Sequence, residues 1–174
     1  GAYAAQSALG TTKIRRGDQE IDLAPPWRRL RLRDAVLEYT GIDYARYPDA
    51  GGLYQAMVDR GYTPERKAHW GKLVDPTLID YVEPHLMQPT FLFDYPLEVS
   101  PLAKRKPNEP GVVERFEFFI GGVEMGNAFS DINDPIDQRE RFLASGRALV
   151  EGDDEAHPLD EDYLTALSYG MPPT

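Results

Sequence analysis

The amino-acid sequence predicts an α+β fold in a single domain. Two β-hairpin patterns, centred on Gly17-Asp18 and Gly121-Gly122, and helical periodicity in the segments around them support this prediction. The length of 174 residues suits one domain, and 41% hydrophobic residues with 11% aromatics can supply a core. We find no internal repeat in the sequence and no sign of a second domain.

Charge and composition narrow the range of functions. Asp and Glu number 29 against 19 Lys and Arg, so the formal net charge is -10. Such a surface repels a phosphate backbone, which makes the segment by itself a poor nucleic-acid binder. The absence of cysteine removes disulfides and thiolate chemistry and fits a reducing cytoplasm. No apolar run approaches the roughly 20 residues of a membrane span, and the N-terminal stretch has no basic region typical of a secretory signal.

The first half of the sequence predicts a hairpin and several helices. The Ala-rich start, GAYAAQSALG, is typical of the end of a helix whose beginning lies outside the sequence. TTKIRRGDQEIDLAPPW alternates around Gly17-Asp18 and predicts two strands with a tight turn. RLRLRDAVLEYTG predicts a helix that stops at Gly41, and LYQAMVDRGY predicts a shorter one closed by Gly61. A helical stripe runs from 64 to 86, and Pro76 inside it predicts a kink near Asp75 or two helices with Asp75 as the cap of the second.

The second half predicts strands followed by helices. QPTFLFDYP is expected to be a strand, and SPLAKRKPNEPG is expected to be a loop. The second hairpin follows in FEFFIGGVEMGNAFSDIND. NDPIDQRERFLASGRALVEG predicts a helix with Asp134 as N-cap, Pro135 at its first position and Gly152 as its stop. An acidic loop and a last helix, EDYLTALSYG, complete the sequence.

The second hairpin contains carboxylates in a run that otherwise reads as buried strand. A two-residue Gly-Gly turn places Ile120 opposite Val123, so Glu117 and Glu124 become diagonal neighbours on one face, about 7–8 Å apart at the backbone. Two such side chains repel each other unless a cation lies between them. Because Mg²⁺ takes one or two carboxylates and fills its other positions with water and substrate phosphates, the pair is a plausible Mg²⁺–nucleotide site. Two solvated glutamates on an open hairpin face are the alternative.

The polar residues that follow do not share this face in a regular strand. Strict alternation places Asn127, Phe129 and Asp131 on the face opposite Glu124. All of them can line one pocket only if the strand slips by one residue, and Gly126 is the natural place for such a bulge. Taken alone, Asn127 can equally be a turn residue and Asp131 a loop or cap residue.

Several long motifs resemble class II lysyl-tRNA synthetase. They are GTTKIRRGDQEIDLAPPWRRL, WGKLVDPTLIDYVEPHL, QPTFLFDYPLEVSPLAKR, FEFFIGG, GNAFSDINDPIDQRERF and DEDYLTALSYGMPPT, in this order from about Gly10 to Thr174. The resemblance implies an antiparallel β-sheet flanked by helices, as one segment (1–174) of the catalytic domain between the second and third class-defining motifs. Motif 1, motif 2, most of motif 3 and the anticodon-binding domain are expected to be absent from this sequence.

The resemblance assigns roles to five residues. Glu117 and Glu124 match the glutamates that hold the Mg²⁺ ions bridging the ATP phosphates. Asn127 is expected to bind ATP–Mg²⁺ together with them. Asn127 also matches an asparagine that hydrogen-bonds the amino-acid substrate, and Phe129 matches an aromatic residue packed along the lysine side chain. Asp131 matches the carboxylate that faces the lysine ε-ammonium, where the family usually has Glu.

Three positions of the expected substrate pocket depart from the family pattern or have a second interpretation. Asp131 is one methylene shorter than the usual Glu, so its contact with the ammonium could become water-mediated. Val123 replaces an arginine often found beside the metal-binding glutamate. Glu98 belongs to a family motif near the active site, although as a loop carboxylate it could equally hold Lys104 or Arg105.

The function implied by the resemblance is that of a lysine–tRNA ligase fragment. The intact enzyme would join lysine and ATP to lysyl-adenylate, release pyrophosphate and pass the lysyl group to tRNA(Lys). It would act as a homodimer in the cytoplasm, with no membrane partner. The isolated chain is expected to be inactive because one side of the ATP pocket is missing. The alternatives are a paralogue that modifies elongation factor P with a lysine derivative, and a non-catalytic interaction module.

Overall fold

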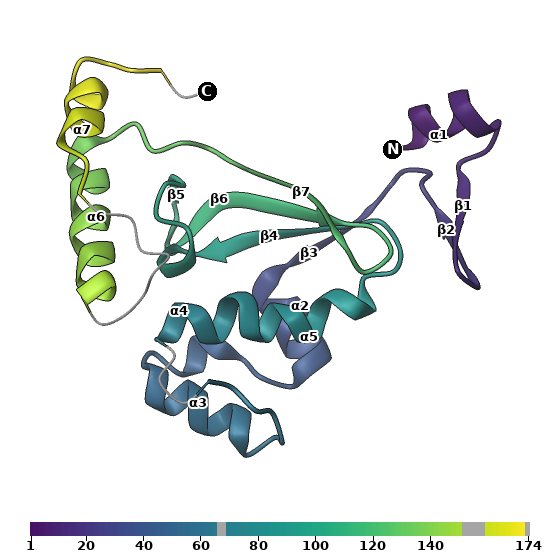
Figure 1. Cartoon of the computed structure of the whole chain (residues 1–174), viewed down its shortest axis with the longest axis horizontal. Helices are drawn as coiled ribbons and strands as arrows, with labels where there is room; N and C mark the ends of the chain where they lie inside the picture. Colours follow the sequence, from purple (N-terminus) through teal and green to yellow (C-terminus); the bar gives the residue numbers. More distant parts are fainter. Residues whose placement is uncertain (66–68, 151–158, 173–174) are drawn as a thin grey trace. The chain divides into compact units, whose positions relative to one another are not determined.

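The structure is a computed structural model that describes residues 1–65, 69–150 and 159–172. Figure 1 traces the chain with its elements. The α-helices are α1 (Ala2–Leu9), α2 (Leu32–Thr40), α3 (Ala50–Val58), α4 (Trp70–Lys72), α5 (Ile79–Val82), α6 (Pro135–Val150) and α7 (Glu161–Ser168). Shorter helical turns are η1 (Tyr44–Arg46), η2 (Leu73–Leu78), η3 (Glu83–His85) and η4 (Leu97–Val99). The strands are β1 (Lys13–Arg16), β2 (Gln19–Asp22), β3 (Arg28–Arg31), β4 (Thr90–Pro96), β5 (Arg105–Lys106), β6 (Glu109–Phe119) and β7 (Glu124–Phe129).

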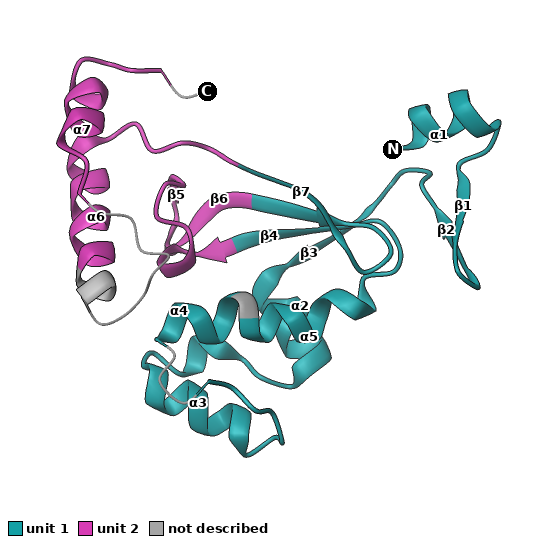
Figure 2. Ribbon diagram, viewed as in Figure 1, with its two compact units in different colours: residues 1–94, 116–128 teal, residues 95–115, 129–174 magenta. Residues whose placement is uncertain are grey.

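The chain forms two compact units (Figure 2). Unit 1 consists of Gly1–Asp94 and Phe116–Ala128, and unit 2 consists of Tyr95–Arg115 and Phe129–Thr174. The strands form one two-stranded sheet, β1-β2, and one five-stranded sheet in the order β3-β4-β6-β5, in which β7 pairs with β6. The α+β class is therefore confirmed.

The sheet is mixed, which corrects the prediction of an antiparallel sheet. β3 pairs with β4 in parallel, with Arg28 opposite Thr90 and Arg31 opposite Phe93. The predicted helix over RLRLRDAVLEYTG is wrong in its first turn for the same reason, because Arg28–Arg31 is a strand and α2 begins only at Leu32. The helix ends as predicted, at a left-handed Gly41.

Unit 1 contains the predicted N-terminal hairpin and the predicted kink. β1 and β2 are antiparallel, and Arg16 lies opposite Gln19, so Gly17-Asp18 forms the turn. In the long helical stripe, the backbone leaves helical geometry at Asp75, with φ -130° and ψ 117°, directly before Pro76. The helical part that the structure describes begins at Trp70, and residues 66–68 of the predicted stripe lie outside the described residues.

The core of unit 1 is built from the helices that follow β3 and from the buried face of its strands. Helix α2 contacts α5, and α3 contacts η2. Fully buried side chains of this core come from these helical segments and from β4 and β6; they include Leu32, Val36, Leu53, Met57, Leu73, Leu78, Val82, Leu92 and Phe119.

Unit 2 contains β5 and the helix pair α6 and α7, which contact each other. Asp134 caps α6 as predicted, since its Oδ1 accepts from the backbone N of Ile136 at 2.8 Å. Asp160 caps α7 by accepting from Tyr163 N at 2.9 Å. The expected loop SPLAKRKPNEPG is only partly irregular, because it includes β5 and the start of β6. Gly152 and the acidic stretch 151–158 lie outside the described residues.

Across the part of the chain that the structure describes, the helices are too short or too polar to cross a bilayer.

Candidate functional site

The Gly-Gly turn of the second hairpin is confirmed. Gly121 has φ +67° and Gly122 has φ +70°. Ile120 N donates to Val123 O at 3.0 Å, which closes a two-residue loop. Two consecutive positive φ angles are typical of a type I′ turn, the turn that matches the twist of a hairpin and that requires glycine-like freedom at both positions.

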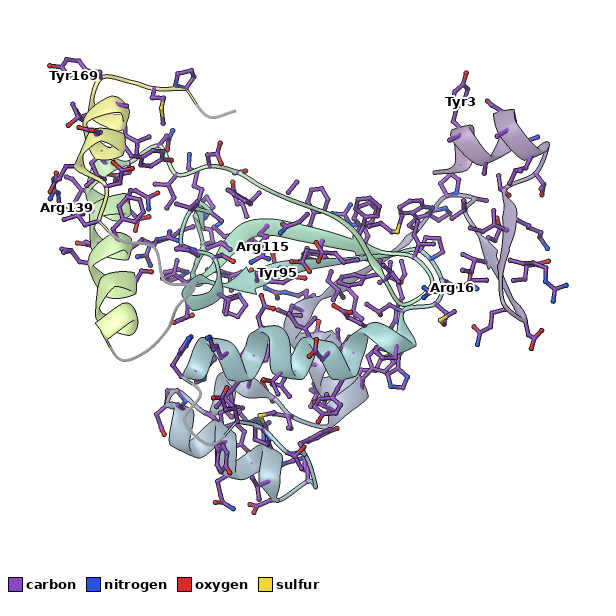
Figure 3. All side chains as sticks on the ribbon, viewed as in Figure 1. Tyr3, Arg16, Tyr95, Arg115, Arg139 and Tyr169 are labelled. Atoms are coloured by element: carbon purple, nitrogen blue, oxygen red, sulfur yellow. The ribbon has the colours of Figure 1, made fainter. Side chains whose placement is uncertain are left out.

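This turn packs against the segment that follows α5 within unit 1. Gly121 N donates to Met87 O at 2.9 Å and Gly122 N donates to Leu86 O at 3.0 Å. A Cβ atom on Gly122 would lie 3.2 Å from the backbone oxygen of Glu83. The guanidinium of Arg16, labelled in Figure 3, donates to Gly121 O. The turn is therefore held on two sides, and Glu83 comes close to it.

Three glutamates gather around this turn. Glu117 on β6 is buried, with 5% exposure, and Glu124 at the start of β7 is exposed. Burial raises the pKa of Glu83, and the negative charges of Asp80, Glu117, Glu124 and Asp75 raise it further. The position of Glu83 was not predicted, because its approach depends on how the turn packs and not on any local pattern.

The carboxylates do not converge by themselves into a complete metal site. Among residues 1–65, 69–150 and 159–172, no group of three His, Cys, Asp or Glu side chains is arranged to hold a metal ion. Glu117 and Glu124 add negative charge near Glu83, and their role as Mg²⁺ ligands, with substrate phosphates and water completing the coordination, stays a prediction.

The one-residue slip of the strand is confirmed, although not at Gly126. A regular ladder from the turn would place Phe118 and Gly126 on opposite faces. Instead, a Cβ on Gly126 would lie 2.4 Å from the ring of Phe118, so the two residues share a face. The extra residue therefore lies between the turn and Gly126, and this register places Asn127 opposite Glu117. Further along, Ser130 N donates to Glu114 O at 2.9 Å, which fits the same shifted register.

Phe129 and Asp131 belong to unit 2. Phe129 is 40% exposed and Asp131 is half-buried. Asp131 forms an antiparallel bridge with Ala103. Burial raises the pKa of Tyr163 on α7, and the negative charge of Asp131 raises it further, so the tyrosine lies within electrostatic reach of the carboxylate. No sequence pattern indicated this neighbour.

Arg105, in the segment after β4, pairs with a carboxylate of α6. Arg105 donates to Asp137 of α6, with Nη2 to Oδ1 at 3.0 Å. The ion-pair partner of Arg105 is therefore Asp137 and not Glu98, and the alternative in which Glu98 holds Lys104 stays a prediction. Glu98 is exposed in η4, and its predicted place near an active site stays a prediction.

Sequence comparisons agree with the resemblance. The family described as tRNA synthetases class II (D, K and N) matches residues 6–174. The lysine–tRNA ligase of Chloroflexus aurantiacus is 52% identical over 165 residues, which are 95% of this chain and 34% of that protein. The lysine–tRNA ligase of Moorella thermoacetica is 48% identical over 172 residues, 99% of this chain and 35% of that protein.

The chain thus spans about a third of the length of these relatives. Because the family match covers almost the whole sequence, the chain belongs to the class II tRNA synthetases of the D, K and N family.

Proposed function

We propose that this chain supplies part of the lysine-activating site of a lysine–tRNA ligase. The observation that carries the proposal is the gathering of Glu83, Glu117 and Glu124 around the Gly-Gly turn of a chain whose relatives are lysine–tRNA ligases. In this proposal, residues 1–174 are one segment of the catalytic domain, and the intact protein is a cytoplasmic homodimer that also binds tRNA(Lys).

Glu117 and Glu124 would hold Mg²⁺ together with the phosphates of ATP. The ion would neutralise phosphate charge during the reaction. The chain's own contribution is electrostatic and geometric, because the two glutamates lie on β6 and β7, which are joined by a tight Gly-Gly turn held by backbone hydrogen bonds. Asn127, opposite Glu117 in the shifted register, would lie next to the same ATP site and would donate a hydrogen bond to lysine.

Phe129 and Asp131 would bind the lysine side chain. The exposed ring of Phe129 offers apolar surface to the four methylene groups, and the Asp131 carboxylate offers a charge-assisted hydrogen bond to the ε-ammonium. In the proposed reaction, the carboxylate of the bound lysine attacks ATP. A carboxylate oxygen of lysine bonds to the α-phosphorus, the bond to the β-phosphate bridge breaks, and pyrophosphate leaves with the electron pair. A hydroxyl group of the tRNA then attacks the lysyl carbonyl carbon and loses its proton, the bond between the carbonyl carbon and the phosphate oxygen breaks, and AMP leaves with the electron pair.

The two alternatives are less well supported. A paralogue that modifies elongation factor P is not favoured, because the relatives at 46–52% identity are lysine–tRNA ligases. A purely interacting module is not favoured either, because the relatives of this chain are ligases.

The direct test is a chimaera in which this chain replaces the matching third of the Chloroflexus aurantiacus lysine–tRNA ligase. We expect lysine-dependent exchange of pyrophosphate into ATP by the chimaera, and none by the isolated chain. A folded chimaera that exchanges with another amino acid, or with none, would overturn the proposal. Exchange by the isolated chain at ordinary enzyme rates would refute the expectation that it is inactive.

A further inference from the structure

Asp131 is placed by a short loop of unit 2. We name residues 100–104, between η4 and β5, the support loop. Asp131 forms its backbone bridge with Ala103 of this loop, and Ala103 is almost completely buried, with 1% exposure. The residues on each side of Asp131 are bonded to the same loop: Lys104 N donates to Ser130 O at 2.7 Å, and Ile132 N donates to Leu102 O at 3.1 Å. Any movement of the support loop therefore moves the backbone of Asp131.

Arg141 of α6 holds the support loop through its carbonyl groups. Its side chain is buried, and Nη1 donates to Ser100 O at 3.1 Å and to Ala103 O at 2.9 Å. Its other nitrogens bind Asp137, with Nη2 to Oδ2 at 3.0 Å. Only the planar guanidinium fork can reach two carbonyls and a carboxylate at once, which a lysine ammonium cannot do with the same geometry.

Two further side chains hold the same segment. Gln138 Nε2 donates to Pro101 O at 3.2 Å. Arg115 Nη1 donates to Val99 O at 2.9 Å and to the Ser100 hydroxyl at 3.0 Å. The guanidinium of Arg115 also lies 4.5 Å from the ring centroid of Tyr95, and Figure 3 shows the two side chains next to each other. Arg141 is distinguished from these by its direct bond to Ala103, the residue paired with Asp131.

We propose that Arg141 is a positioning residue for the lysine ammonium, acting through the support loop on Asp131. This inference rests on the proposed function, in which Asp131 binds the ε-ammonium. An aspartate has one rotatable bond fewer than the glutamate usual at this position, so it depends more on where its backbone is held. The chain combines the shorter carboxylate with a backbone that is paired on both sides and held by a buried arginine.

The first test uses the chain itself and needs no activity. We expect Arg141→Met to speed hydrogen exchange of the Lys104 and Ile132 amides by about tenfold or more. Arg139→Met is the matched control, because Arg139 lies on the same helix and pairs with the exposed Glu161. Arg139→Met should leave the exchange rates of the Lys104 and Ile132 amides unchanged. Arg141→Met should leave the exchange rate of the Ile120 amide in unit 1 unchanged. Equal exchange in Arg141→Met and the unsubstituted chain would overturn the inference.

The double variant Arg141→Met/Asp137→Asn covers the case in which the single variant fails to fold. In the single variant, the Asp137 carboxylate loses its partner Arg141, and Asp137→Asn removes that charge. The support loop still loses the two hydrogen bonds from Arg141 to its carbonyl groups. The same faster exchange of Lys104 and Ile132 is expected. Unchanged protection in a folded double variant would also overturn the inference.

The second test uses the chimaera and separates this inference from the proposed function. We expect Arg141→Met to raise the KM for lysine by about tenfold while the KM for ATP changes little, because a misplacement of about 1 Å is costly in a reaction site. Arg141→Lys should restore only part of the loss. If Asp131→Asn raises the KM for lysine and Arg141→Met does not, the inference fails and the proposed function stands. If Asp131→Asn also leaves that KM unchanged, the proposed lysine site itself is wrong.

Discussion

Glu83 in unit 1 and Asp137 in unit 2 are both partly buried carboxylates, but their surroundings shift their pKa values in opposite directions. Burial and four neighbouring acidic side chains raise the pKa of Glu83. Burial alone would also raise the pKa of Asp137, but the hydrogen bonds and charges of Arg141 and Arg105 outweigh it and lower that pKa. Around the turn of the second hairpin, negative charges lie near one another. At Asp137 in α6, the negative charge is neutralised by two arginines.

The pKa shifts distinguish the hairpin around Glu83, where we propose that ligands bind, from the part of α6 around Asp137, which supports the fold. Like charges held together cost free energy in the folded state, and a bound cation would remove that cost. The charge of Asp137 is already neutralised within the protein by its ion pairs with Arg105 and Arg141. We therefore expect ligands to act on the first region and substitutions to unfold the second.

The largest expected effect is on activity at the hairpin. In the chimaera, Glu117→Gln should lower lysine-dependent pyrophosphate exchange by about 100-fold or more, because it removes a preorganised charge at the reacting phosphates. The control is Glu140→Gln, the same change at an exposed position of α6. Loss of less than about twofold in Glu117→Gln would remove Glu117 from the proposed site.

The largest expected effect on stability is at Asp137. Asp137→Asn should lower the free energy of unfolding by about 3 kcal/mol at pH 7, since it leaves the buried Arg141 without its carboxylate. The folded-state pKa of Asp137 is lowered, so its stabilisation is present above the ordinary pKa near 4 and is lost as pH falls through the folded-state value. Urea unfolding at pH 7 and pH 3 should show the difference between the two proteins shrinking at pH 3.

The matched control for this prediction is Glu161→Gln. Glu161 pairs with Arg139 at 2.6 Å on the exposed surface of α6 and α7, and it should change stability little at either pH. Equal losses from Asp137→Asn and Glu161→Gln would contradict the distinction between buried compensation and a solvated ion pair.

A smaller loss is expected at the turn. Gly122→Ala should cost about 1–2 kcal/mol because φ is +70°, and the new methyl group would meet the Glu83 carbonyl at 3.2 Å. Gly146→Ala on α6 is the opposite case. It meets no atom within 4 Å, and it should raise stability by about 0.5–1 kcal/mol because alanine favours the helix. Thermal unfolding of both variants checks the signs, and a stabilised Gly122→Ala would exclude the type I′ turn.

The smallest expected effect is that of Glu83→Gln. Because the folded-state pKa of Glu83 is raised, its stabilisation is present below its ordinary pKa and is lost as pH rises through the folded-state value. The variant should therefore be slightly more stable than the unsubstituted chain at pH 7, and this difference should disappear below about pH 4. A less stable variant at pH 7 would show that Glu83 has a compensating partner.

Local rules predicted the features that depend on neighbouring residues. The Gly121-Gly122 turn, the break at Asp75 before Pro76 and the Asp134 cap each follow from the conformational limits of two or three residues. The alternation of side chains along a strand predicted that the strand slips by one residue. It did not predict that the extra residue lies between the turn and Gly126.

The features that sequence reasoning missed depend on distant partners. β3 is rich in arginine, and its strand form requires β4, which lies about 60 residues away in the sequence. Arg31 pairs with Asp94 at 2.9 Å, and Arg29 lies over the rings of Phe91 and Phe93. The alternation of arginine and leucine in RLRLR was the available signal. The approach of Glu83 to the hairpin and of Arg141 to Ala103 had no comparable signal, because each depends on the packing of separate elements.

The most direct test of the central claim is a carboxyl NMR titration of the isolated chain, with and without Mg²⁺ and ATP. Without ligand, we predict that Glu83 titrates above its ordinary range while Asp137 titrates below it. Mg²⁺ with ATP should move the Glu83 titration to lower pH and leave Asp137 unchanged. If Mg²⁺ with ATP at millimolar concentrations leaves Glu83 unmoved, or if both groups titrate together near pH 4, the hairpin does not gather charge for a cation.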